Sequence, residues 1–169
     1  MRVWAGLKWI FTHPLIVTLF RVALGLVFVV ASLDKIVSPA AFAQNIANYR
    51  LVPYPWINAL AIALPWLEFL VGLLLAAGIW IRETVMIISV LLIVFIVAIG
   101  QAIAQGLDIS CGCFDTDPAA HKMSRWTLYW DIIWLTWGML VFGYDRGRFS
   151  VARMFSMRGH SPEANTKEA

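Results

Sequence analysis

Four long apolar stretches constrain the fold of this chain more than any other feature of its sequence. They cover roughly Leu15–Leu33, Ile57–Trp80, Thr84–Ala104 and Trp126–Gly143. About 20 mostly apolar residues are enough for a helix to cross a hydrocarbon core of about 30 Å. Water is absent from that core, so each crossing segment must close its own backbone hydrogen bonds. We therefore predict an all-α integral membrane protein built as a bundle of four transmembrane helices.

The composition of the 169-residue chain excludes the main alternatives to a membrane bundle. Hydrophobic residues make up 61% of it and charged residues only 14%, whereas a soluble domain is about half apolar and a quarter charged. Two cysteines are too few for a disulfide-rich secreted fold. The net charge of +3 does not indicate nucleic-acid binding, because most charges lie outside the apolar stretches. The expected surrounding is a lipid bilayer, with no nucleic-acid partner.

The distribution of basic residues predicts how the bundle is oriented. Four spans place both termini on one side, which carries eight lysines and arginines, while the opposite side carries four. The eight are Arg2, Lys8, Arg82, Arg146, Arg148, Arg153, Arg158 and Lys167, and the four are Lys35, Arg50, Lys122 and Arg125. Because basic loops stay in the cytoplasm, we expect a bacterial inner-membrane protein with both termini inside. The chain then divides into a cytoplasmic segment 1–14, a membrane domain 15–143 and a basic, partly disordered cytoplasmic tail 144–169.

The connections on either side of the second stretch also carry structural signals. In the first outer loop, Ser38-Pro39 is a typical helix start. Phe42, Ile46 and Tyr49 follow at helical spacing, which predicts a short interfacial helix. After the second stretch, only residues 81–83 precede the third one, which predicts a tight antiparallel hairpin.

The only two cysteines, Cys111 and Cys113, lie on either side of Gly112 in the second of the two predicted outer loops. Disulfides persist outside the cytoplasm. A bridge between residues two apart closes a small, strained ring, and glycine permits the backbone angles that such a ring needs. Strained, exposed disulfides are the labile and catalytic ones, and so short a ring adds little stability. We therefore favour a thiol–disulfide exchange pair.

Two other interpretations of the same cysteines stay open. Both thiolates, with His121 or Met123, would make a soft-metal site suited to Cu(I). Alternatively, the thiols are inert and the loop docks to a larger membrane complex, which would make the chain a non-catalytic assembly subunit. Nearby charges bear on reactivity, since Asp115 disfavours the reactive thiolate and His121 favours it.

Four ionisable residues lie within the predicted spans or at their ends. Arg21, Glu68 and Asp131 lie inside spans, and Lys35 ends the first one. Such residues are costly in lipid and usually face the bundle interior in pairs. We estimate how deep each residue lies in the membrane from its position in its span, at 1.5 Å per residue. Residues at similar depth can meet, which predicts an ion pair of Arg21 with Glu68 and another of Lys35 with Asp131. These four charged residues serve either as polar links between helices or as the lining of a path for protons or a quinone head group.

Small residues accompany the predicted buried charges. Arg21 and Gly25 share one stripe of the first helix, and Glu68 and Gly72 share one face of the second. Because glycine lets a second helix approach closely, we expect these two faces to meet.

Several short motifs follow one another in order along residues 15–143. They are Arg21-Val-Ala-Leu-Gly-Leu-Val-Phe28, Ala31-Ser-Leu-Asp-Lys35, Tyr49-Arg-Leu-Val-Pro53, Pro65-Trp-Leu-Glu68 and Ser110-Cys-Gly-Cys-Phe114. In these motifs and their order, the chain resembles the MauE/DoxX family of small four-helix bacterial membrane proteins. One position departs from the pattern: Asp115 stands where a glycine is expected after Phe114.

This resemblance implies a role in the redox maturation of extracytoplasmic proteins. MauE-type members are associated with methylamine utilisation and with a thioredoxin-like partner that forms disulfides. DoxX-type relatives are linked to quinone-coupled sulfur oxidation, which implies a quinone as the cofactor. The resemblance further implies that Cys111 and Cys113 act as a thiol–disulfide oxidoreductase pair, with Lys35 and Glu68 as recurrent polar positions.

Overall fold

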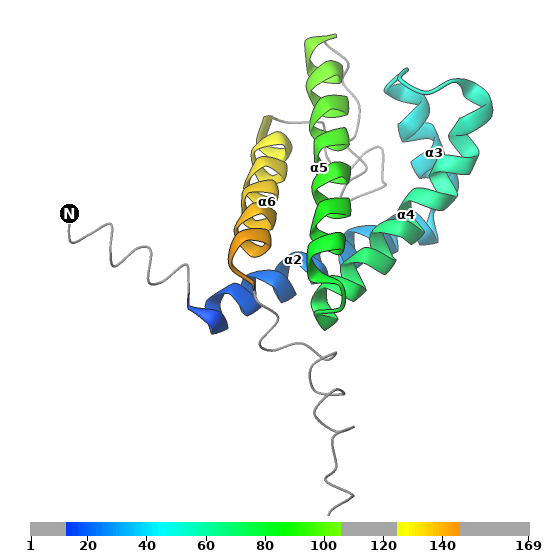
Figure 1. The fold of residues 1–169 in the computed structure, drawn as a ribbon. Helices are drawn as coiled ribbons and strands as arrows, with labels where there is room; N and C mark the ends of the chain where they lie inside the picture. Colours follow the sequence, from blue (N-terminus) through cyan, green and yellow to red (C-terminus); the bar gives the residue numbers. More distant parts are fainter. Residues whose placement is uncertain (1–12, 106–124, 146–169) are drawn as a thin grey trace, which may run out of the picture.

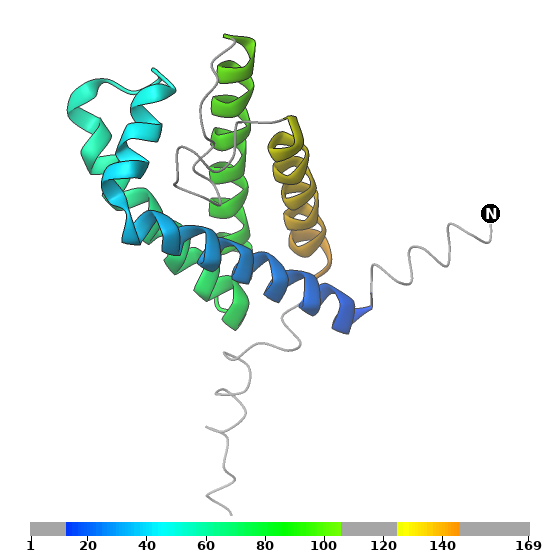
Figure 2. The same ribbon diagram turned by 180° about the vertical axis from the view of Figure 1, so that it is seen from behind.

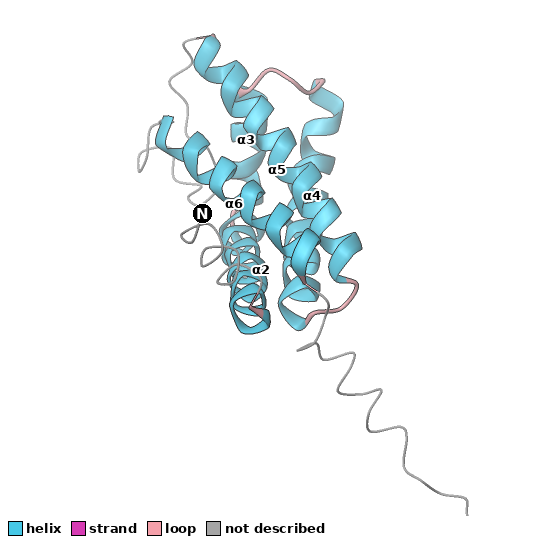
Figure 3. Ribbon diagram, turned by 60° about the vertical axis from the view of Figure 1, so that its left-hand side comes forward, coloured by secondary structure: helices cyan, strands magenta, loops and turns pink. Residues whose placement is uncertain are grey.

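The computed structural model describes residues 13–105 and 125–145, which form five α-helices (Figure 1). In chain order these are α2 (Pro14–Val37), α3 (Pro39–Asn48), α4 (Tyr54–Ala77), α5 (Ile81–Ala104) and α6 (Arg125–Tyr144). Within the two described ranges there is no β-strand (Figure 3). The all-α prediction is therefore confirmed for the described part of the chain.

Three of the helices, α2, α4 and α5, are long and apolar enough to cross a membrane. Each has 24 residues, and at 1.5 Å per residue this gives a length of about 36 Å, more than the thickness of a hydrocarbon core. Large apolar side chains such as Leu19, Val30 and Val97 are exposed on these helices, as expected for surfaces that lipid covers. Three of the predicted spans are thus present as candidate membrane helices.

The fourth predicted span corresponds to α6, and its membrane crossing stays a prediction. This helix has 20 residues, but it is not among the three candidate spans found within the described residues. Its sequence includes four tryptophans, two tyrosines and Asp131, and such amphipathic and charged side chains lower its mean hydropathy. In the fold, α6 packs along α5 (Figure 1).

The turn between α4 and α5 lies earlier than the sequence predicts. Residues 81–83 were expected to separate the two helices, but α5 already begins at Ile81 and the turn consists of residues 78–80. Gly78 has a φ of 74°, a conformation that glycine adopts without a side-chain penalty. The amide of Gly78 donates to the Leu75 carbonyl and that of Ile79 donates to the Leu74 carbonyl, which closes the helix end. The antiparallel hairpin itself is present.

A short helix, α3, follows α2 where Ser38-Pro39 predicts one. It covers Pro39–Asn48, with Ser38 at the N-cap position but without a side-chain cap hydrogen bond. Phe42 and Ile46 are buried against Ile57 and Ala61 of α4. The helix is therefore fixed by packing on α4, while its position at a membrane interface stays a prediction.

Helices α2 and α4 cross in close contact. Viewed from behind, α2 runs across the axes of α5 and α6 (Figure 2), and it packs most extensively against α4. A Cβ atom placed on Gly25 would lie 2.6 Å from the Gly72 carbonyl oxygen, and one placed on Gly72 would lie 2.8 Å from the Gly25 carbonyl oxygen. The two backbones therefore touch, as the small residues on these faces predict.

Candidate functional site

Lys35 and Glu68 form a buried ion pair between α2 and α4. The Lys35 ammonium donates a hydrogen bond to Glu68 Oε2 at 2.7 Å. Lys35 is 2% exposed and Glu68 1%, so water does not screen the attraction between them. A buried charge is tolerated only when a partner compensates it, and each of these side chains therefore depends on the other.

The ion pairs in the structure differ from those predicted from the depth of each residue in its span. Glu68 binds Lys35 and not Arg21. Arg21 instead pairs with Asp145, with 3.2 Å between Nη1 and Oδ2. Lys35 likewise does not form its ion pair with Asp131, although both side chains line the same cavity. The burial of all four predicted intramembrane residues is nevertheless correct.

The crossing at Gly25 and Gly72 explains the pairing that is observed. Arg21 precedes Gly25 by four residues and Glu68 precedes Gly72 by four. Because α2 and α4 are antiparallel, the two charges lie on opposite sides of the crossing point, about 12 Å apart along the helix axes. Lys35 follows Gly25 and therefore lies on the same side of the crossing as Glu68.

Two aromatic rings cover the ammonium group of Lys35. The Nζ atom lies 5.2 Å from the centroid of the Phe42 ring and 5.0 Å from that of Phe95. Both distances are within the range in which a cation is attracted to the face of a ring. Phe42 belongs to α3 and Phe95 to α5, so side chains from four helices meet at this one charge.

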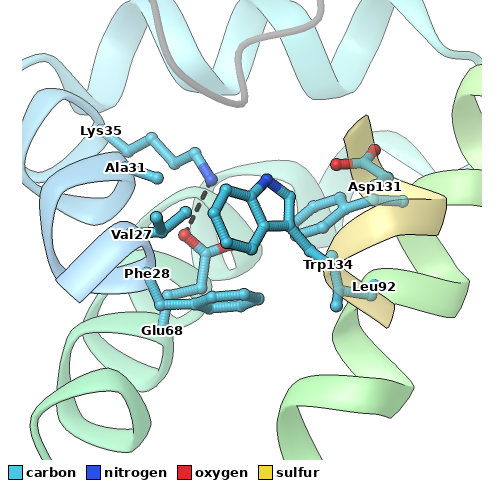
Figure 4. Close-up of a pocket in the computed structure, with 9 residues that line it drawn as sticks. Val27, Phe28, Ala31, Lys35, Glu68, Leu92, Asp131 and Trp134 are labelled. Carbon is cyan, nitrogen blue, oxygen red and sulfur yellow. Dashed lines mark hydrogen bonds and ion pairs between the residues drawn. The ribbon is translucent and has the colours of Figure 1, made fainter. Parts of the chain in front are cut away.

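A cavity of about 30 Å³ adjoins the ion pair. Figure 4 shows Lys35 and Glu68 pointing toward one another from α2 and α4, with Asp131 and Trp134 placed on α6. Asp131 is 3% exposed. Three ionisable side chains from three helices therefore line one small cavity, and we refer to Lys35, Glu68 and Asp131 as the charged cluster.

Two carboxylate oxygens of the charged cluster lack a protein partner. Glu68 Oε1 and Asp131 Oδ2 are buried and accept no hydrogen bond from any described residue. Most buried polar atoms have a partner, and an unpartnered carboxylate oxygen is costly. The cavity is therefore a place where a water molecule or a proton would be bound.

Tyr49, at the end of α3, is a further titratable group near Asp131. Burial raises the pKa of its hydroxyl above the ordinary value, and the charge of Asp131 raises it further. Tyr49 therefore keeps its proton throughout the physiological pH range and acts near the charged cluster only as a neutral group.

A second, larger cavity of about 350 Å³ lies between α3, α4 and α5. Its walls are apolar, and Tyr49 supplies the one hydroxyl group among the described lining residues. Phe42 and Phe95 line this cavity while also covering the Lys35 ammonium. The volume is within the range typical of small-molecule sites, and the lining suits an apolar chain.

The cysteine half of the predicted site lies outside the described residues. This applies to Cys111 and Cys113 and to the two residues expected to modulate them, Asp115 and His121. Their roles, including the alternative metal site formed by both cysteines with His121, stay predictions. Within residues 13–105 and 125–145, no group of three histidine, cysteine, aspartate or glutamate side chains is placed to hold a metal ion.

Three residues that contact the buried charges or line their cavity were not predicted from the sequence. Asp145 directly follows α6, at the same end of the fold as the start of α2, and its charge is the signal that would have suggested a partner for Arg21. Phe95 and Trp134 give no such signal, because an aromatic residue in an apolar helix looks the same whether it faces lipid or a buried charge.

Apolar helices around buried ion pairs define a multi-pass membrane protein of the all-α class. The chain matches the family model of the methylamine utilisation protein MauE over residues 13–144. It therefore belongs to the MauE family, as the motifs in the sequence predict. No curated protein and no solved structure matches the chain.

Proposed function

We propose that this chain supports disulfide formation in extracytoplasmic proteins through thiol–disulfide exchange at Cys111 and Cys113. The observation that carries the proposal is the Cys-Gly-Cys sequence, which lies within the part of the chain that matches the MauE family. Membership of a methylamine-utilisation family supports a role in redox maturation. A thioredoxin-like protein is the proposed partner.

The proposed topology has four spans in a bacterial inner membrane, with α6 as the fourth. Both termini are cytoplasmic, and residues 15–143 form the membrane domain. The segment that holds the cysteines joins the end of α5 to the start of α6, and in this topology it is extracytoplasmic. The excess of basic residues on the terminal side supports this orientation, and the length of α6 is sufficient for a crossing.

The exchange begins from a Cys111–Cys113 disulfide and a partner with two thiols. One partner thiolate attacks a sulfur of the disulfide, so that the bond within the pair breaks and a mixed disulfide forms. The second partner thiolate then attacks the mixed disulfide. The partner leaves oxidised, having lost two electrons and two protons, and the Cys111–Cys113 pair has gained both.

A lipid-soluble quinone is the cofactor that we propose for reoxidation of the cysteine pair. When bound, it would take up the two electrons and two protons that the dithiol releases. The apolar cavity between α3, α4 and α5 supports this proposal, because its volume and lining fit an isoprenoid chain. Phe42, Phe95 and Tyr49 are the residues that would contact such a ligand.

The variant Cys111→Ser tests the exchange. Full-length protein in liposomes is mixed with a reduced thioredoxin-fold protein as the dithiol, and its oxidation is followed by a maleimide gel shift. We expect the oxidised wild type to convert up to one dithiol per chain and Cys111→Ser to give only the rate of empty liposomes. The matched control Ser110→Ala should match the wild type. Undiminished oxidation by Cys111→Ser would contradict the proposed exchange.

A further inference from the structure

The charged cluster carries an unequal number of positive and negative groups. Lys35 contributes one positive charge, while Glu68 and Asp131 each contribute a negative charge when ionised, so the fully ionised cluster has a net charge of −1. All three side chains are at least 97% buried. An uncompensated charge in a low-dielectric interior is strongly disfavoured, and such a site becomes neutral by binding a proton.

We propose that the charged cluster is a proton-binding site, with one exchangeable proton held on Asp131 at neutral pH. Of the two carboxyl groups, Glu68 accepts the charge-assisted hydrogen bond of the Lys35 ammonium at 2.7 Å, and such a bond favours its ionised form. Asp131 has no ion pair with any described residue, and its Oδ2 has no hydrogen-bond partner there. The proton is therefore held by Asp131.

The cavity supplies a route by which this proton exchanges. A site of about 10–15 Å³ is enough for one water molecule, and this cavity measures about 30 Å³. Polar groups are available to such a water at Glu68 Oε1 and Asp131 Oδ2, the two oxygens without a protein partner. A water bound in this cavity would give the proton on Asp131 a group with which to exchange.

Among the described titratable groups near the cavity, Asp131 is the one that we propose to hold the added proton at neutral pH. Lys35 from α2 and Glu68 from α4 line the cavity together with Asp131. Tyr49, at the end of α3, does not line this cavity, but it lies close enough for the charge of Asp131 to act on its hydroxyl group. From α5, the cavity is lined by Leu92 and Phe95, which do not titrate. Tyr49 keeps its proton and therefore does not compete with Asp131 for another.

The proton site at Asp131 is independent of the proposed cysteine chemistry. Lys35 lies two residues before the end of α2, and Asp131 lies in the second turn of α6. Because α2 is antiparallel to α4 and α4 to α5, the end of α2 and the start of α6 lie on the side of the fold toward which α5 runs. In the proposed function the quinone takes up both protons that the dithiol releases, so the proton held on Asp131 is a separate one.

Isotope-edited infrared spectroscopy of the full-length protein in liposomes tests the proposal without a mutation. A protonated carboxyl group has a carbonyl-stretch band that an ionised carboxylate lacks. We expect one such band from a buried group at neutral pH, shifted when the aspartates are labelled with ¹³C and unshifted when the glutamates are labelled. A band that shifts with glutamate labelling, or no band at all, would overturn the assignment.

Two variants provide an independent check of the same site. Asp131→Asn should abolish the band completely, whereas Asp34→Asn, which changes an exposed aspartate at the end of α2, should leave it unchanged. Helix content measured by circular dichroism confirms that each variant is folded. A folded Asp131→Asn protein that keeps the band would overturn the proposal.

Discussion

Lys35→Met is expected to lower the free energy of unfolding by about 3–5 kcal/mol, the usual effect of removing one partner from a buried ion pair. The ammonium of Lys35 is the only ion-pair partner of Glu68 within the described residues, and water cannot replace it at 1% exposure. The variant leaves a buried carboxylate that must take up a proton or disrupt its surroundings. Thermal unfolding in a mild detergent, followed by circular dichroism, measures the loss.

A second substitution separates loss of the pair from loss of packing. In Lys35→Met/Glu68→Leu both charges are replaced by apolar side chains, and such a replacement is often neutral. We expect the double variant to recover most of the lost stability. Asp34→Asn, next to Lys35 but exposed, should unfold like the wild type. A double variant less stable than Lys35→Met would contradict the role assigned to the pair.

Gly25→Ala and Gly72→Ala are expected to destabilise the fold by about 1–3 kcal/mol each, the usual effect of overpacking a tight contact. The added Cβ atom would lie 2.6 Å from a backbone oxygen in the first variant and 2.8 Å in the second. A backbone atom cannot rotate away as a side chain does, so α2 and α4 must move apart. The same thermal unfolding measurement in detergent detects the loss.

The chain offers a matched control for this prediction. Gly100 lies inside α5, and a Cβ atom added there meets nothing within 4 Å. Gly100→Ala is therefore expected to be neutral, or to gain up to about 1 kcal/mol from the better helix propensity of alanine. Equal effects of alanine at Gly25 and at Gly100 would show that the crossing of α2 and α4 is not the tight contact described above.

Hydropathy and spacing were sufficient to predict the helices and the faces they bury. The stripe that holds Arg21 and Gly25 is buried on α2, and the face that holds Glu68 and Gly72 is buried on α4. These predictions succeed because burial in a bundle follows helical periodicity, which is a property of a single segment. The apolar stretches predicted four spans, of which three are present as candidate spans within the described residues.

The ion pairs between helices and the position of the turn after α4 were not predicted correctly. Depth along each span paired Arg21 with Glu68, but the contact at Gly25 and Gly72 sets the register between α2 and α4, and no single stretch encodes it. The turn after α4 was placed three residues too late, because an apolar pattern continues past the left-handed Gly78 that ends the helix.

A redox titration of Cys111 and Cys113 in the purified full-length protein tests the proposed exchange most directly. The protein is equilibrated in a series of thiol–disulfide buffers, its free thiols are counted by maleimide shift, and bound metal is measured on the same samples. We predict a reversible two-electron transition with a midpoint between about −270 and −120 mV, the range of working exchange catalysts, and no bound metal. Thiols that stay reduced across the series, whether they carry Cu(I) or no metal, would contradict the proposed function.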